Sequence, residues 1–245
     1  MDAYGEAGKF RYSGAVRAAK LGAIGSITRS LTLATDNHPH TGAMGYNDTI
    51  TKIPACAIST IGADALIETL KNDPNAEVEI FMNCETLPDK LSYNVIAEIK
   101  GSEFPEEIIV VGGHLDAWDI GVGAHDDGSG CVQSMEVLRI FRDLQIVPKR
   151  TIRVVLFMNE ENGLKGGVKY AEEAMKNREF HIAAIESDAG GFSPTGWNMV
   201  CDSLKSKSLD KWKKLFEPYG MYQWECDGGG ADINQLKSHG ALLIG

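Results

Sequence analysis

The sequence predicts an α/β fold: a mostly parallel, mixed sheet with helices on both faces. Two observations predict it. Runs rich in β-branched residues, apolar on both faces, alternate with segments that have helical periodicity, as in βαβ units. The composition also fits a globular chain, since 43% of the 245 residues are hydrophobic and 24% are charged. Residues 92–245 hold most of these elements, and residues 1–91 resemble a smaller α/β module.

Residues 1–91 contain short elements that predict this smaller module. We expect a helix over residues 15–23, capped by Ser13, and a second helix that Thr60 precedes and that ends near Asn72. We expect strands at residues 26–31, 52–59 and 76–85, the last because its apolar residues alternate. Residues 36–48 are predicted to be a loop. No catalytic set of residues is evident in this segment, and His38 and His40 are interpreted as loop residues.

Residues 92–245 show the alternation of strand and helix most clearly. Strands are expected at residues 94–101, 106–114, 150–161, 181–188 and 240–245, and helices at residues 129–144, 165–177, 209–219 and 233–238. Because the central strands are apolar on both faces, they are predicted to lie inside the sheet with helices on either side.

Charge and composition exclude several classes of protein. The net charge of −10 disfavours binding to nucleic acid, and no apolar run approaches the ~20 residues that a membrane span needs. The five cysteines are far apart and form no CxxC pair, so a zinc finger or thioredoxin-type motif is not expected. One disulfide is compatible with the spacing but cannot be assigned.

Charged residues follow the predicted central strands at the point where each strand ends. His114 and Asp116 end the first, Glu160 and Glu161 the next, and Asp188 the third, while Asp126 and Asp127 lie between the first strand and its helix. In open α/β sheets, ligands bind beyond the carboxyl ends of the strands. Clustered carboxylates are costly unless a cation neutralises them, and carboxylates with an imidazole suit zinc. The sequence therefore predicts a metal site, with Asp126 able to bridge two cations.

The same residues predict hydrolytic chemistry. In an HxD segment, Asp116 can accept the ring N–H of His114 and so orient the other ring nitrogen toward the metal. One of Glu160 and Glu161 can bind metal while its neighbour takes a proton from metal-activated water. Each residue alone has a simpler interpretation: Asp126 and Asp127 as a helix cap, the two glutamates as a loop, and His114 as a core residue.

Four motifs in this order resemble those of the co-catalytic di-zinc exopeptidases, nearest to the carboxypeptidase branch of that superfamily. They are GGHLDAWDIG, GAHDDGSG, FMNEENGLKGG and IESDAGG. The resemblance implies that His114 and Asp188 hold one zinc, Asp126 bridges, and Glu161 binds the second zinc. It implies Glu160 as the general base and Asp116 as the residue that orients His114. Asp127 has no implied ligand role, and we expect it to cap a helix.

The resemblance also implies an overall organisation. Residues 1–91 would be an incomplete protease-associated (apical) domain, and residues 92–245 a catalytic domain truncated at its C-terminal end. The histidine expected on the second zinc is not found, and we do not expect His239 or His125 to replace it. The chain is therefore expected to be a fragment that binds one zinc better than two and has little activity.

The function predicted from the sequence is zinc-dependent hydrolysis of a peptide bond in short peptides by an exopeptidase, with a homodimer possible. The resemblance implies a secreted or lysosomal location. The alternatives are a glutaminyl cyclase-like reaction and a binding module that has lost catalysis. Whether the enzyme recognises the amino or the carboxyl end of its substrate, and which side chain it prefers, stays open.

Overall fold

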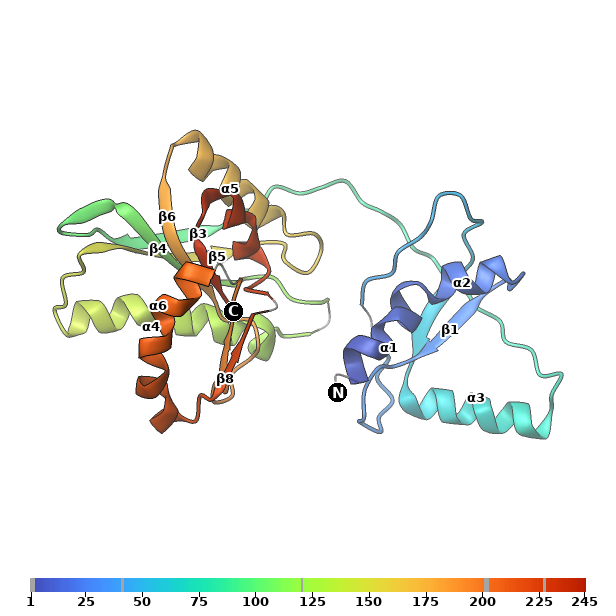
Figure 1. Ribbon diagram of the computed structural model, residues 1–245. Helices are drawn as coiled ribbons and strands as arrows, with labels where there is room; N and C mark the ends of the chain where they lie inside the picture. The colour runs from blue at the N-terminus through green and yellow to red at the C-terminus, as the bar shows by residue number, and fades with distance from the viewer. Residues whose placement is uncertain (1–2, 41, 120, 201–202, 227) are drawn as a thin grey trace. The chain divides into compact units, whose positions relative to one another are not determined.

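The computed structural model describes residues 3–40, 42–119, 121–200, 203–226 and 228–245. The contacts between residues divide the chain into two compact units, Met1–Pro88 and Asp89–Gly245. Each unit is described by itself below (Figure 1).

The first unit is a small α/β module built on a two-stranded parallel sheet. Its strands pair with Ser26 opposite Ala55. The helix α3 (Thr60–Asn72) begins at Thr60, one residue before its expected start. The residue that caps it is Ser59, whose hydroxyl accepts the Gly62 N–H at 2.9 Å. The elements are α1 (Ala3–Tyr12), α2 (Gly14–Lys20), β1 (Ser26–Arg29), β2 (Ala55–Ile58) and α3 (Thr60–Asn72).

Two expectations for this unit are wrong. Residues 76–85 are not a strand, although their apolar residues alternate. A strand is stabilised by pairing with a neighbour, and these residues have none; Phe81 is 90% exposed. Ser13 stands at the N-cap position of α2, but its side chain does not cap it. The Ser13 hydroxyl instead donates to the Lys9 carbonyl at 2.9 Å.

The second unit confirms the predicted mixed, mostly parallel sheet. Its strand order is β3-β5-β4-β6-β9, and only the β3–β5 pair among these is antiparallel. The carboxyl ends of β4, β5 and β6 consequently meet at one edge, where the motif residues follow. The strands are β3 (Val95–Ile99), β4 (Phe104–His114), β5 (Arg150–Phe157), β6 (Phe180–Glu186) and β9 (Leu242–Ile244).

Helices cover both faces of this sheet (Figure 1). They are α4 (Ser129–Asp143), α5 (Lys165–Lys176) and the 3-10 helix η3 (Asp232–His239). Side chains alternate along β5: Val154 and Leu156 pack with Cys131 of α4, whereas Val155 and Phe157 pack with α5 and η3. This two-sided burial explains why the central strands are apolar on both faces.

The remaining elements lie beside the end of β6. A second parallel pair, β7 (Gly196–Asn198) and β8 (Gln223–Glu225), is joined by α6 (Ser203–Phe216) and the short η2 (Glu217–Tyr219). Cys226 is disulfide-bonded, whereas Cys56, Cys84 and Cys131 are free. Among the described helices, none has the length and apolar character that crossing a membrane requires.

Candidate metal centre

His114 ends β4, and three of its polar groups are held by hydrogen bonds. Its main-chain N–H donates to Asp127 Oδ2 at 2.9 Å, and its carbonyl accepts the Cys131 thiol at 3.0 Å. Its Nδ1 lies 2.9 Å from the main-chain carbonyl of Asp116, so Nδ1 carries the proton and Nε2 faces the other way. The side chain is 1% exposed, and the ring is therefore fixed in position and tautomer.

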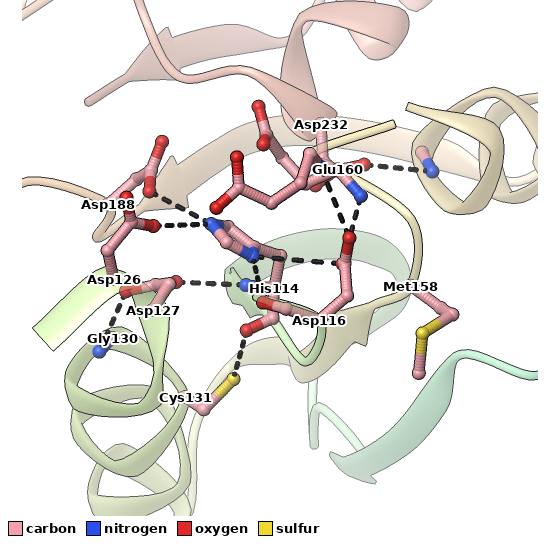
Figure 2. A network of polar contacts seen from close by, with 12 residues as sticks. His114, Asp116, Asp126, Asp127, Gly130, Cys131, Met158, Glu160, Asp188 and Asp232 are labelled. Carbon is pink, nitrogen blue, oxygen red and sulfur yellow. Dashed lines mark hydrogen bonds and ion pairs between the residues drawn. The ribbon is translucent and has the colours of Figure 1, made fainter. Parts of the chain in front are cut away.

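Two carboxylates converge on the free nitrogen of this ring (Figure 2). His114 Nε2 lies 3.1 Å from Asp126 Oδ1 and 3.2 Å from Asp188 Oδ1. Ligands about 2.0 Å from a tetrahedral zinc are separated by about 3.3 Å. These donor atoms all lie within 4.8 Å of one another, so their spacing fits a single cation. The structure thus brings together His114, Asp126 and Asp188, the three residues expected to hold one zinc.

Glu160 and Glu161 follow β5 and form a second group with the same histidine. Their carboxylates and the ring of His114 also offer ligand atoms within 4.8 Å of one another. The two glutamates are positioned by Asp116, whose carboxylate accepts the N–H of Glu160 at 2.9 Å and that of Glu161 at 3.2 Å.

The role expected for the Asp116 carboxylate therefore needs correction. It was expected to accept the ring N–H of His114, but its nearer oxygen lies 3.7 Å from Nδ1. The main-chain carbonyl of Asp116 takes that position instead. The carboxylate is engaged by the main-chain N–H groups of the turn after β5, so Asp116 links the His114 strand to the Glu160–Glu161 turn.

Asp127 connects the same strand to α4. Its Oδ1 accepts the Gly130 N–H at 3.0 Å, which agrees with the expected helix cap. Its Oδ2 binds the His114 N–H, a contact that sequence reasoning did not anticipate. The strand must come close for this: a Cβ atom on Gly113 would lie 2.5 Å from Asp127 Oδ2. A glycine before His114 is thus required sterically. The Asp126–Asp127 peptide bond is cis.

The electrostatics of the centre favour a cation. Burial raises the pKa of Glu160 to about 7, and the negative charges of Asp188 and Glu161 add to the rise. Burial, followed by the charge of Asp126, also raises the pKa of Glu161. Burial lowers the pKa of His114, but the hydrogen bond and charge of Asp188 outweigh it and bring that pKa to about 10. A divalent cation in place of the ring proton would satisfy the same carboxylates.

Two buried acids behind the centre were missed by sequence reasoning. Glu186, the last residue of β6, accepts the N–H groups of Asp232 and Ile233, both at 3.2 Å. Asp232 accepts the Gly167 N–H at 3.0 Å and thereby caps the start of α5. Burial and the charge of Glu186 raise the pKa of Asp232 to about 7. No local spacing in the sequence indicates these contacts.

Other histidines do not join the centre. His239 is the last residue of η3, and its ring lies 5.8 Å from that of His181, measured between centroids. His125 accepts the Gly191 N–H through Nδ1 at 3.2 Å and packs edge-on against Phe192. Among the described residues, neither contributes to a group of three potential metal ligands.

An α/β sheet whose strand ends bring an imidazole and several carboxylates to one point defines an α/β protein with a metal-binding centre. Residues 94–240, which include every residue of the centre, match Peptidase family M28. The chain belongs to that family.

Curated relatives extend this similarity over both units. The chain is 37% identical to human carboxypeptidase Q over 244 residues, covering 98% of this chain and 52% of the relative. It is 38% identical to carboxypeptidase Q of Xenopus laevis over 237 residues, covering 97% of this chain and 50% of the relative. The chain thus spans about half the length of the curated relatives it matches.

Solved structures confirm the predicted fold class. A peptidase M28 precursor from Shewanella amazonensis superposes with a TM-score of 0.83 at 37% identity, covering 98% of this chain and 55% of that one. A zinc aminopeptidase from Bacillus subtilis gives a TM-score of 0.61 at 21% identity, covering 96% and 57%. At that identity, the second likeness concerns the fold alone.

Proposed function

We propose that this protein is part of a zinc-dependent exopeptidase that hydrolyses peptide bonds in short peptides. The observation that carries the proposal is the convergence of Asp126 and Asp188 on His114 Nε2, at 3.1 and 3.2 Å. Membership of Peptidase family M28 and the carboxypeptidase Q relatives support the same chemistry.

Each residue of the centre has a separate proposed role. His114, Asp126 and Asp188 would hold one zinc, and Glu161 with Asp126 would contribute to a second. Zinc, when bound, would polarise the scissile carbonyl and make water more acidic. Glu160 would take the proton of the attacking water and pass it to the leaving amine, a role supported by the position of its carboxylate beside the ring of His114 and the carboxylate of Glu161. Asp116 would hold the Glu160–Glu161 turn through its main-chain contacts.

The first unit and the cellular location are proposed by resemblance. Met1–Pro88 would be a protease-associated module that contributes no catalytic group. A secreted or lysosomal location would agree with the disulfide at Cys226, because disulfides persist in oxidising compartments.

Replacement of Glu160 by glutamine tests the proposal. With zinc-loaded protein and unblocked dipeptides, Glu160→Gln is expected to lower kcat at least about 10²-fold, because the proton acceptor is removed. Zinc content, measured by atomic absorption, should be retained. Glu172→Gln, an exposed change on α5, is the matched control and should leave kcat unchanged.

Two outcomes would contradict the proposal. One is full turnover by Glu160→Gln. The other is a wild-type protein that releases no amino acid from any dipeptide but does cyclise an amino-terminal glutamine, which would point to the glutaminyl cyclase-like alternative.

A further inference from the structure

Helix α6, orange in Figure 1, concentrates positive charge in an acidic chain. Residues 203–216 contain five lysines and one aspartate, a net charge of +4, whereas the whole chain carries −10. Exposed charges are screened over about 8–10 Å at physiological ionic strength, so a partner beside α6 experiences mainly the local charge. The helix can therefore attract a negatively charged partner despite the net charge of the chain.

One face of α6 packs on protein and the opposite face is open to solvent. On the packed face, the ring of Phe216 contacts those of Trp197 and Trp224, with centroids 5.7 and 5.9 Å apart. At 3.6 residues per turn, the side opposite Phe216 holds three exposed lysines at the spacing i, i+4, i+7. This lysine stripe, about 10 Å long at 1.5 Å per residue, consists of Lys207, Lys211 and Lys214.

The lysine stripe has no acidic partner among the described residues. The one ion pair that α6 makes within that part of the chain joins Lys213 to Asp210 at 2.8 Å. Lys213 belongs to the packed face, because its ammonium lies 5.5 Å from the centroid of the Trp224 ring. Burying the three ammonium groups of the stripe without acids would cost their desolvation. Whatever covers the stripe must therefore supply negative charge.

Apolar side chains border the lysine stripe along one side. Trp212 is 47% exposed and Leu215 is 62% exposed, and the ammonium of Lys211 lies 5.9 Å from the centroid of the Trp212 ring. Tryptophan is enriched at the membrane–water boundary, and lysines beside exposed tryptophan and leucine are typical of surfaces that bind anionic lipids. A soluble polyanion would use the lysines but would gain little from these apolar side chains. The combination thus favours a lipid surface.

We propose that this face of α6 binds the surface of an anionic lipid bilayer. The lysine stripe lies at the level of the headgroup phosphates, and Trp212 and Leu215 insert between the headgroups. The inference goes beyond the proposed function and does not depend on the metal centre.

Co-sedimentation of the whole chain with lipid vesicles tests this inference. At about 0.1 M salt, the chain should partition at least about tenfold more strongly into phosphatidylcholine vesicles with about 30% phosphatidylserine than into pure phosphatidylcholine vesicles. Replacing the lysine stripe (Lys207→Gln, Lys211→Gln and Lys214→Gln together) should remove this preference, because each lysine near an anionic surface contributes about fivefold. Trp212→Ala and Leu215→Ser should each weaken binding to the phosphatidylserine vesicles severalfold.

A charge-matched variant is the control for the lysine stripe. It lowers the net charge by the same amount and should bind the phosphatidylserine vesicles as the wild type does. It replaces three exposed lysines outside α6, as Lys71→Gln, Lys169→Gln and Lys176→Gln together. Circular dichroism checks that every variant is folded.

Three results would overturn the inference. The first is equal partitioning of the wild type into both kinds of vesicle. The second is a stripe variant that keeps the preference, or that loses no more of it than the control does. The third is wild-type vesicle binding by both Trp212→Ala and Leu215→Ser, which would show that α6 recognises charge alone, as in binding a soluble polyanion or an acidic protein. Because none of these measurements requires peptidase activity, the proposed function stands or falls separately.

Discussion

Replacing Asp127 with alanine should destabilise the second unit by about 2–4 kcal/mol. The side chain is 1% exposed, and its oxygens accept the N–H groups of His114 and Gly130 at 2.9 and 3.0 Å. Each buried donor left without an acceptor costs about 1–3 kcal/mol. Part of this loss is offset, because the buried carboxylate is itself unfavourable: burial raises the pKa of Asp127 to about 6. The expected loss of about 2–4 kcal/mol is therefore smaller than the ~6 kcal/mol that two unpaired donors could cost at most.

Urea unfolding followed by circular dichroism, with a chelator present, measures this effect separately from zinc binding. Asp127→Asn keeps one acceptor oxygen and should lose roughly half as much as Asp127→Ala. Asp143→Ala is the matched control on the same helix, because its ion pairs with Arg139 and Arg142 are on the surface. Such pairs are worth at most about 1 kcal/mol.

A free energy of unfolding for Asp127→Ala within about 0.5 kcal/mol of the wild-type value would refute this reasoning. It would mean that water satisfies the two N–H groups, and that Asp127 is not what holds His114 to α4. Zinc affinity gives an independent readout, since a displaced His114 main chain should weaken zinc binding in Asp127→Ala and not in Asp143→Ala.

Three further outcomes are expected. Burial lowers the pKa of His181 from 6.5 to about 4, so as pH falls the unfolded chain takes up this proton before the folded protein does. His181 should therefore contribute up to about 3 kcal/mol to the free energy of unfolding above pH 6.5, and this contribution should be lost by pH 4. Urea unfolding of His181→Gln should not show this loss. Gly167→Ala should lower the free energy of unfolding in urea by about 1–3 kcal/mol, because the added Cβ would lie 2.6 Å from Asp232 Oδ1. Gly228→Ala is the control and should leave this free energy unchanged, because a Cβ there would have no atom within 4 Å. Calorimetric titration should show one tight zinc equivalent that His114→Ala abolishes; two tight equivalents in the wild type would contradict the incomplete second site.

The central fold was predictable because its signals are local and repeated. Val110, Val155 and Ala184 are all fully buried, each in a run of apolar residues that only a strand covered on both faces accommodates. The wrong strand at residues 76–85 shows the limit of such signals. Alternation describes which side chains share a face, but pairing requires a neighbouring strand, and no periodicity within a segment reports whether one exists.

The centre was predictable to the extent that topology determines it. Once β4 and β6 are parallel neighbours, the residues after them must meet, and Asp188 does lie 3.2 Å from His114 Nε2. The contact of Asp232 with Gly167 links residues 65 positions apart and joins a side chain to a main-chain N–H. Every residue except proline offers such a donor, so the sequence contains no signal that selects this one.

The acids of the centre serve two physically different purposes, and the difference suggests how the site is built. Asp116, Asp127 and Glu186 each accept two main-chain N–H groups. These hydrogen bonds offset part of the cost of burying the three carboxylates, although burial still raises the pKa of Asp127 and of Glu186. Asp126 and Asp188 instead face the ring of His114. The first group is held by main-chain contacts, whereas the proposed zinc would neutralise the second group. A frame formed in advance keeps the donor atoms at ligand spacing, and zinc binding then need not organise the strands that present them.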